Sequence, residues 1–309
     1  MINSSSDGTL PFKFCSNHRF YLSNDAVTIL TCVISALLAP IAVAGNYLVL
    51  AAIWRNPSLR TPSYTFLCAL ALTDLCTGLL GQPFYVLYRV AELKVYKNLY
   101  CVASAVAHSI VPYLVTLTGL TITAMAVERW LHMSQRSLIT VRRVYIIETT
   151  FAILLIPYMA MRRLPGMAAY FDIPIASISE GVLAFCCFAI SSIAYFKVFR
   201  IIHRHQQQVH ANTNAAGRDV INLEKYRKSV HTILWILALF LLCYAPFVLS
   251  TVFMKALDIS YETSLTVLHL STTMLFMSSS LNPFLYIWRL KEIRNEAKHV
   301  IRKMFCRGA

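Results

Sequence analysis

Long uncharged stretches alternate with short polar segments along the 309 residues of this sequence. A helix that crosses the hydrocarbon core of a bilayer, about 30 Å thick, needs roughly 20 mainly apolar residues. Seven stretches meet or approach this length: Val27–Trp54, Tyr64–Tyr88, Asn98–Val127, Val144–Met161, Ile173–Phe196, Ser229–Met254 and Thr263–Trp288. Backbone amides find no water in hydrocarbon, so each stretch is expected to be helical. The pattern predicts an all-α, seven-transmembrane helix bundle.

A different pattern follows the last apolar stretch. After Trp288, apolar residues recur every three or four positions with basic residues between them, which predicts a short amphipathic helix on the membrane surface. We therefore expect three parts: an extracellular tail (1–25), the seven-transmembrane bundle (26–288), and an amphipathic helix with a cytoplasmic tail (289–309). The longest polar insertion, His203–Asn222, is expected to be a loop between the fifth and sixth spans.

Composition and charge agree with a membrane protein. Only 14% of the residues are charged, whereas soluble domains carry about 25%. Placing the C-terminus inside puts 20 of the 28 Lys and Arg residues on the cytoplasmic side and 8 outside, so the positive-inside rule predicts an extracellular N-terminus. No cleavable signal peptide is expected, since the first 25 residues lack an apolar core. The net charge of +14 is interpreted as a signal for anionic lipids and an acidic cytoplasmic partner, not for nucleic acid.

Acidic residues within the predicted spans number only three: Asp74, Glu148 and Glu180. A charge at mid-membrane costs at least ~2.5–3.5 kcal/mol on insertion scales, which makes Asp74 a functional candidate. Its predicted polar company from other spans is Asn46, Thr118, Ser278 and Asn282. Oxygen ligands of these kinds suit a small cation. A structural polar core with water is the alternative, and the sequence leaves both open.

The predicted third, sixth and seventh spans carry further features. Glu128 precedes Arg129 near the end of the third span, and such an acid can hold a guanidinium and release it on protonation. An arginine that extends to the membrane surface is the simpler interpretation. Pro246 and Pro283 lie inside the sixth and seventh spans, where proline permits a kink and a hinge.

Six short motifs occur in a fixed order on these spans. They are Gly45-Asn46, Asn56 with Leu59-Arg60-Thr61, Leu70-Ala71-Leu72-Thr73-Asp74, Glu128-Arg129-Trp130, Cys243-Tyr244-Ala245-Pro246 and Asn282-Pro283-Phe284-Leu285-Tyr286. In this order the chain resembles, over nearly its whole length, the rhodopsin-like (class A) G-protein-coupled receptors. The resemblance implies a plasma-membrane receptor, not an enzyme, that transduces an extracellular ligand to heterotrimeric G proteins.

The resemblance also implies roles for individual residues. Asp74, Thr118, Ser278 and Asn282 are similar to the family's sodium pocket, so an allosteric Na⁺ is the one cofactor implied. Arg129 resembles the arginine that meets the G protein, and Tyr195 and Tyr286 resemble tyrosines that swing toward it. Phe240 and Tyr244 stand at the aromatic switch beneath the ligand.

Several positions depart from the family pattern. Tyr244 stands where tryptophan is usual, Cys187 where proline is usual, and Tyr226 where an acid usually holds the arginine. Cys101 lies three residues early for the family's outer disulfide, and residues 162–172 lack its usual cysteine partner. Since Cys15 is the other cysteine exposed to an oxidising compartment, a Cys15–Cys101 bridge is our hypothesis.

The sequence mainly indicates which classes of ligand are not expected. Val111 occupies the position of the amine receptors' aspartate, and Phe276 that of the opsins' lysine, so a monoamine and retinal are not expected. The predicted outer pocket comprises His108, Val111, Val115, Glu180, Phe247, His269 and Phe276. Glu180 either meets a cationic ligand or pairs with Arg162 or Arg163, the pairing we favour. The chain loosely resembles the melanocortin, cannabinoid, lysophospholipid and adenosine branch; a peptide, a lipid and a small molecule all stay open.

Two modification sites are candidates. Asn3-Ser4-Ser5 is a glycosylation sequon on the predicted outer side. Cys306 follows the amphipathic helix and is either palmitoylated or a reduced thiol. The tail after Trp288 contains no serine or threonine, which predicts little desensitisation through its phosphorylation.

Two rival functions remain. A receptor-like membrane protein without G-protein coupling is suggested by the altered switch. A seven-span transporter is disfavoured because its usual internal repeats are missing from the sequence.

Overall fold

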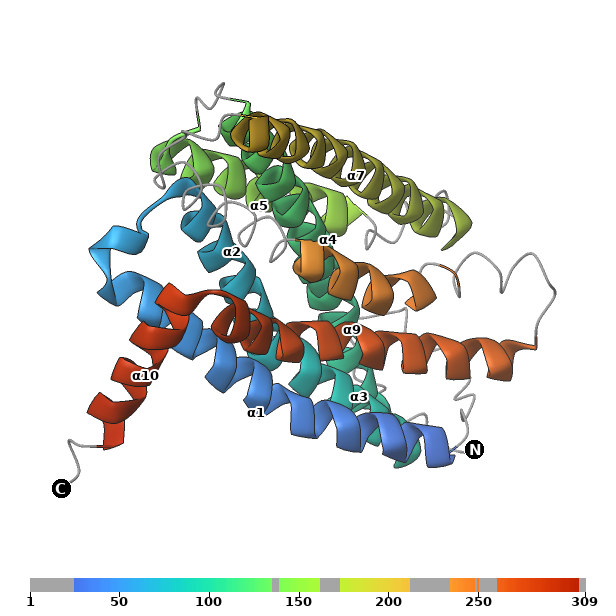
Figure 1. The fold of residues 1–309 in the computed structure, drawn as a ribbon. Coiled ribbons are helices and arrows are strands. Elements are labelled where there is room, and N and C mark those ends of the chain that lie inside the picture. The colour runs from blue at the N-terminus through green and yellow to red at the C-terminus, as the bar shows by residue number, and fades with distance from the viewer. Residues whose placement is uncertain are drawn as a thin grey trace, which may run out of the picture.

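The computed structural model describes residues 25–134, 139–161, 173–211, 234–247, 249 and 260–305, and almost all of them are helical (Figure 1). The elements are α1 (Asp25–Arg55), η2 (Pro57–Leu59), α2 (Pro62–Cys76), η3 (Thr77–Gly81), α3 (Gln82–Leu93), α4 (Lys97–Met133), α5 (Val141–Met161), α7 (Ile173–Ala211), the helix Leu234–Phe247, α9 (Tyr261–Arg289) and α10 (Lys291–Phe305). Every predicted apolar stretch contains helical residues, although Tyr64–Tyr88 spans α2, η3 and α3, and only residues 234–247 and 249 of the sixth stretch are described. The predicted all-α bundle is confirmed.

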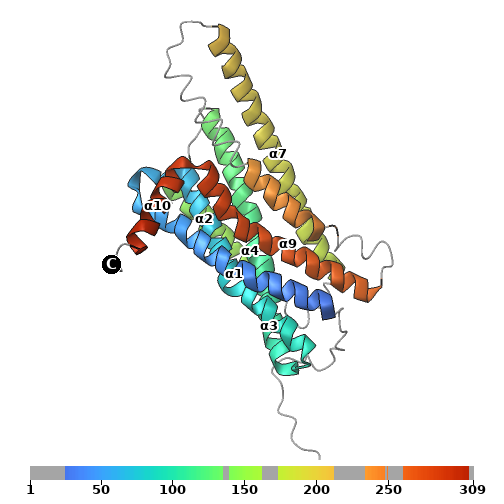
Figure 2. The same ribbon diagram turned by 60° about the horizontal axis from the view of Figure 1, so that its bottom comes forward.

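The helices pack around α4. This helix contacts α2, α3, α5 and α7, while α1 packs against α2, α3 and α9. Figure 2 shows α1 and α9 side by side and α7 extending beyond its neighbours. We call the end of the bundle where α10 leaves α9 the α10 end, and the other the opposite end.

The outer surface of the bundle is apolar. Four described helices are long and apolar enough to cross a membrane: Asp25–Arg55, Pro62–Leu93, Lys97–Met133 and Gly181–Arg204. Large apolar side chains such as Phe185 and Leu242 are 70% and 67% exposed. A contiguous apolar surface of this kind marks contact with lipid or protein, and together with helix length it makes the chain a multi-pass membrane protein.

The second span is longer than the sequence predicts. Pro83 has no N–H to donate to the preceding turn, and the π-helical segment η3 directly before α3 accommodates this gap. The helix then continues to Leu93, whereas the apolar pattern ends at Tyr88. This extension brings Arg89 and Glu92 into the helix.

Two contacts fix α9 and α10 against α1. A Cβ on Gly45 would lie 2.9 Å from the Cβ and Cγ of Pro283, so α1 and α9 approach at a position that only glycine permits. Directly after the end of α1, the Asn56 side-chain amide donates a 3.1 Å hydrogen bond to Glu296 of α10. Ile293 is among the α10 residues buried against the bundle, and the predicted amphipathic helix is confirmed.

One predicted loop is partly wrong. α7 continues as a helix to Ala211, although the polar insertion was expected to leave the helix at His203. The segment from His203 to Ala211 contains no glycine or proline and includes three glutamines, which are good helix formers. The rest of the insertion lies outside the described residues, and the three-part division of the chain stays a prediction.

Candidate functional site

A polar core joins α2 to α9 in the middle of the bundle. The Asn282 side-chain amide donates a 2.8 Å hydrogen bond to Asp74 Oδ2, and each residue is only 2% exposed. The Ser279 hydroxyl is a second polar neighbour of Asp74. Ser278 is also buried, but among the described residues no hydrogen bond joins it to Asp74. The structure therefore brings Asp74 and Asn282 together as predicted and adds Ser279.

The polar core extends to α1 and α4. The hydroxyl of Thr118 on α4 shares a 3.1 Å hydrogen bond with that of Thr73, the residue before Asp74. Asn46 on α1 donates to the backbone carbonyl of Ser279 at 3.0 Å. Four helices thus meet at buried polar side chains, which is how a charged residue is accommodated within a span.

This core has the donors that a small cation needs. The side-chain oxygens Asn46 Oδ1 and Asn282 Oδ1 are buried, and neither has a hydrogen-bond partner among the described residues. Carboxylate, amide and hydroxyl oxygens are the ligands that hard cations prefer. The residues present therefore fit the Na⁺ that the sequence resemblance implies.

At the α10 end, a buried carboxylate lies beside an arginine. Glu128 is 1% exposed and accepts a 3.0 Å hydrogen bond from the Ser63 hydroxyl of α2. Arg129 Nε lies 3.6 Å from the same oxygen, Glu128 Oε2. The carboxylate thus holds the arginine and ties α4 to α2. Ser63 had no role in the sequence prediction.

Two buried tyrosines lie near charged residues of the bundle: Tyr195 near Arg129 and Glu128, and Tyr286 near Asp74. The hydroxyls of Tyr195 on α7 and Tyr286 on α9 are buried without a hydrogen-bond partner among the described residues. Since a buried hydroxyl favours a hydrogen-bond partner, these two side chains are candidates for new hydrogen bonds when the helices rearrange.

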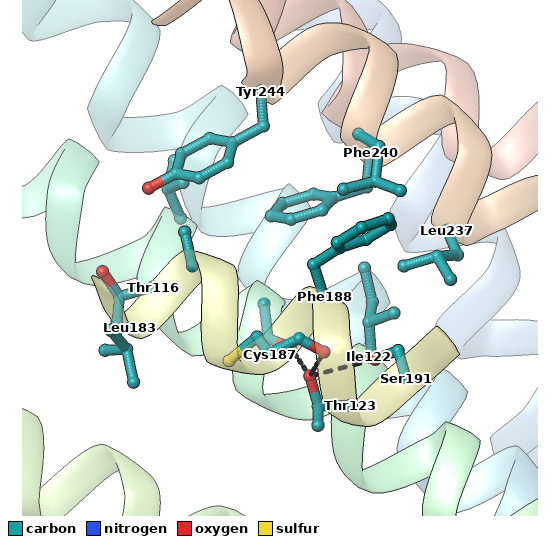
Figure 3. Close-up of a pocket in the computed structure, with 14 residues that line it drawn as sticks. Thr116, Ile122, Thr123, Leu183, Cys187, Phe188, Ser191, Leu237, Phe240 and Tyr244 are labelled. Carbon is teal, nitrogen blue, oxygen red and sulfur yellow. Dashed lines mark hydrogen bonds between the residues drawn. The ribbon is translucent and has the colours of Figure 1, made fainter. Parts of the chain in front are cut away.

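A small cavity lies between α4, α7 and the helix Leu234–Phe247, with a volume of about 40 Å³ (Figure 3). Its lining is mainly apolar and includes Val115, Gly119, Phe188, Phe240 and Tyr244. The rings of Phe240 and Tyr244 stack at 5.3 Å, and a Cβ on Gly119 would lie 3.6 Å from Phe240. Pockets for drug-sized ligands have roughly 300 Å³ or more, so in this conformation the cavity is too small for one.

The lower wall of the cavity carries a polar contact between α4 and α7. Figure 3 shows Thr123, Cys187 and Ser191 together. The Thr123 hydroxyl donates to the Cys187 carbonyl at 3.4 Å, and Ser191 donates to Thr123 at 3.3 Å. Here α7 has a backbone carbonyl bonded to α4 at the position where the family usually has proline.

A second cluster, the outer aromatic cluster, lies toward the opposite end and gathers around α3. The Tyr85 ring contacts Phe276 at 5.2 Å and His269 at 6.1 Å, and the Tyr88 ring lies 5.2 Å from His108. Three predicted pocket residues therefore share one cluster. Tyr85 and Tyr88 were not predicted.

The other predicted pocket residues lie around these two regions. Val111 packs against the outer aromatic cluster, and Val115, four residues later on the same face of α4, lines the cavity. Phe247 stacks on Tyr244 at 6.1 Å. Glu180 belongs to α7, but its side chain lies outside the described residues. The predicted pocket is thus divided between a small cavity and a filled aromatic cluster.

Comparison with known proteins decides the family. The model of the family described as 7 transmembrane receptor (rhodopsin family) matches residues 45–286. The chain belongs to this receptor family. The receptor is 22% identical to the octopamine receptor beta-2R of Chilo suppressalis, over 89% of this chain and 80% of that protein. It is 23% identical to the human adenosine receptor A2a (86% and 70%) and 24% identical to the adenosine receptor A3 of Ovis aries (87% and 88%).

Arg89 is a feature of the receptor that the sequence reading missed. It is fully buried and pairs with Glu92 on its own helix and with the Thr28 hydroxyl on α1. Tyr85, Tyr88, Arg89 and Glu92 follow the spacing i, i+3, i+4 and i+7, which places them along one helix face. This spacing is visible in the sequence and could have predicted the shared helix face. The second span was expected to end at Tyr88, so Arg89 and Glu92 were left out of it.

The receptor's disulfide and modification sites are only partly described. Cys101 is disulfide-bonded, and the six cysteines expected to be packing residues are free: Cys32, Cys68, Cys76, Cys186, Cys187 and Cys243. The bonded partner lies outside the described residues, as do Cys15 and Cys306. Asn3 also lies outside them, so the sequon stays a prediction.

Proposed function

We propose that this receptor transduces an extracellular ligand to heterotrimeric G proteins, with its N-terminus outside the plasma membrane. The observation that carries the proposal is the Glu128–Arg129 pair at the end of α4, held to α2 through Ser63. Losing the carboxylate's negative charge frees the guanidinium for an acidic or carbonyl-rich partner. The excess of basic residues at the α10 end of the bundle supports a cytoplasmic location for that end.

The proposed ligand is a molecule other than a monoamine or retinal. Val111 and Phe276 stand at the two positions where those ligands require an aspartate and a lysine in the family, and Val111 packs against the cluster that contains Phe276. The relatives named for octopamine and adenosine share only 22–24% identity with this chain, which is too little to assign their ligands to it. The aromatic and apolar side chains near α3 and α4 suit a peptide, a lipid or a neutral small molecule.

The proposed signal passes from the small cavity to the α10 end. A ligand that favours one packing of Phe240 and Tyr244 shifts the population toward the conformer in which their helix has moved. Pro246 and Pro283 lie within the two helices that carry the motion, where proline lowers resistance to bending. A Na⁺ held at Asp74 would supply a positive charge that stabilises one conformer of the polar core.

Nucleotide exchange on purified G proteins tests the proposal. Membranes carrying the receptor are mixed with a panel of G proteins and with tissue extract, before and after protease digestion. Arg129→Ala is compared with Arg142→Ala, which removes an exposed arginine from the start of α5. We expect exchange that Arg129→Ala abolishes and Arg142→Ala preserves. Sensitivity of the response to digestion indicates a peptide ligand, and resistance a lipid or small molecule. No exchange under any condition would favour a receptor-like protein without coupling.

A further inference from the structure

A groove lined by basic side chains lies between α4 and α7 at the α10 end. Its volume is about 370 Å³. Its lining residues are Trp130, Ser134, Lys197, Arg200, Ile201 and Arg204. We call it the basic groove. It is separate from the apolar cavity, with which it shares no lining residue.

The three cations of the basic groove share one face of α7. Lys197, Arg200 and Arg204 are three and four residues apart, which aligns them along the helix. All three are exposed, whereas Val198 between them is buried against the bundle. Residues 181–211 contain no aspartate or glutamate, and within the described residues no carboxylate forms an ion pair with any of the three. In the described part of the chain, the three positive charges at the groove therefore have no carboxylate partner.

Aromatic rings position two of these cations. Lys197 Nζ lies 4.1 Å from the centroid of the Trp130 ring, and the Arg200 guanidinium lies 4.5 Å from that of Phe196. Cation–π contacts of this kind restrain a charged side chain without neutralising it. The groove is thus prepared for an anion before one binds.

The cations of the basic groove lie at the level expected for the lipid headgroups. The apolar span Gly181–Arg204 ends at these cations. From Lys197 to Arg204 the helix rises about 10 Å, comparable with the headgroup layer of one leaflet, roughly 5–8 Å thick. The cytoplasmic leaflet carries the anionic lipids, and the excess of basic residues assigns this end to that side.

We propose that the basic groove binds the phosphate groups of an anionic phospholipid headgroup, of the phosphatidylinositol phosphate type. Arginine forks and a lysine together suit clustered phosphate oxygens. Residues two apart on a helix point about 200° apart. Accordingly, Trp130 lies against Lys197 of α7, while Glu128 accepts a hydrogen bond from Ser63 of α2. The lipid therefore lies beside Arg129 on the outer side of the α4–α7 contact, where it stabilises that contact.

The full-length receptor in phosphatidylcholine vesicles containing a photoreactive phosphatidylinositol bisphosphate tests this site. Arg200→Gln with Arg204→Gln removes two charges from the groove; Arg302→Gln with Lys303→Gln removes two exposed charges from α10 and is the control. A cation near an anionic surface strengthens lipid association about fivefold. We therefore expect labelling to fall more than about tenfold in the groove variant and to be much less affected in the control. Equal labelling of wild type and groove variant overturns the proposal.

Two further arms separate the lipid from other occupants. Soluble inositol trisphosphate is titrated against the receptor in detergent, and binding as tight as that of the lipid would mean a free phosphate ligand and overturn the lipid assignment. If the groove variant retains full labelling but loses G-protein activation, the groove belongs to the protein interface, which also overturns it. Labelling needs neither agonist nor G protein, so it is independent of the proposed signalling function.

Discussion

Replacing Gly45 by alanine tests the close contact between α1 and α9. The added Cβ would lie 2.9 Å from two carbons of Pro283, whereas carbon atoms prefer separations of about 3.5–4.0 Å. Both groups belong to helical backbone or a rigid ring, so neither can rotate away. Overpacking of this kind costs about 1–3 kcal/mol. The helix propensity of alanine offsets about 0.5–1 kcal/mol of that cost.

Gly181 provides a matched control, since a Cβ there has no heavy atom within 4 Å. Thermal unfolding of the two purified variants, scanned at one rate against wild type, measures the difference. We expect Gly45→Ala to lower Tm by a few degrees and Gly181→Ala to leave it unchanged or raised. Equal shifts in the two variants would refute the argument, because helix propensity alone would then account for both.

Four further predictions concern the polar core, the arginine pair and the disulfide. Asp74→Asn removes the charge and keeps the shape. We expect NaCl, relative to choline chloride, to suppress basal nucleotide exchange in wild type and to have no such effect in this variant. Asn282→Ala removes a hydrogen bond to a charged group, worth about 1.5–3 kcal/mol, and should lower Tm. Glu128→Gln removes the charge that holds the arginine and keeps an oxygen for Ser63, so agonist-independent exchange should rise; unchanged exchange contradicts the lock. If Cys101 is bonded to Cys15, their single and double serine variants should lose the same stability, about 2–4 kcal/mol, whereas additive losses exclude the bond.

The spans and the centre of the polar core followed from the sequence because their physical causes are local. An uncharged run of sufficient length must be helical in lipid, and the charge of Asp74 requires polar partners wherever it lies. The rotation of each helix is not local. Ser278 and Ser279 lie four and three residues before Asn282, and both spacings place a side chain near its face. Only the packing of α9 against its neighbours selects Ser279 as the polar neighbour of Asp74.

Arg89 shows a second limit of pattern reading. A cation normally marks the end of a span because its burial is expensive, and the second span was therefore ended one residue earlier. Glu92 and the Thr28 hydroxyl compensate the guanidinium, so the helix can continue. Glu92 is visible in the sequence at i+3, but Thr28 belongs to α1 and becomes a partner only through the tertiary fold.

The ligand end could not be predicted for a related reason: its side chains bind one another. His108 lies against Tyr88, and His269 and Phe276 lie against Tyr85, while the neighbouring cavity holds about 40 Å³. A drug-sized ligand needs roughly 300 Å³ or more, so binding must displace some of these contacts. The apparent affinity is then the intrinsic affinity multiplied by the fraction of molecules already open. The shape and chemistry of the opened conformer therefore determine which ligand binds. The lining residues of the closed conformer show only which side-chain contacts the ligand must replace.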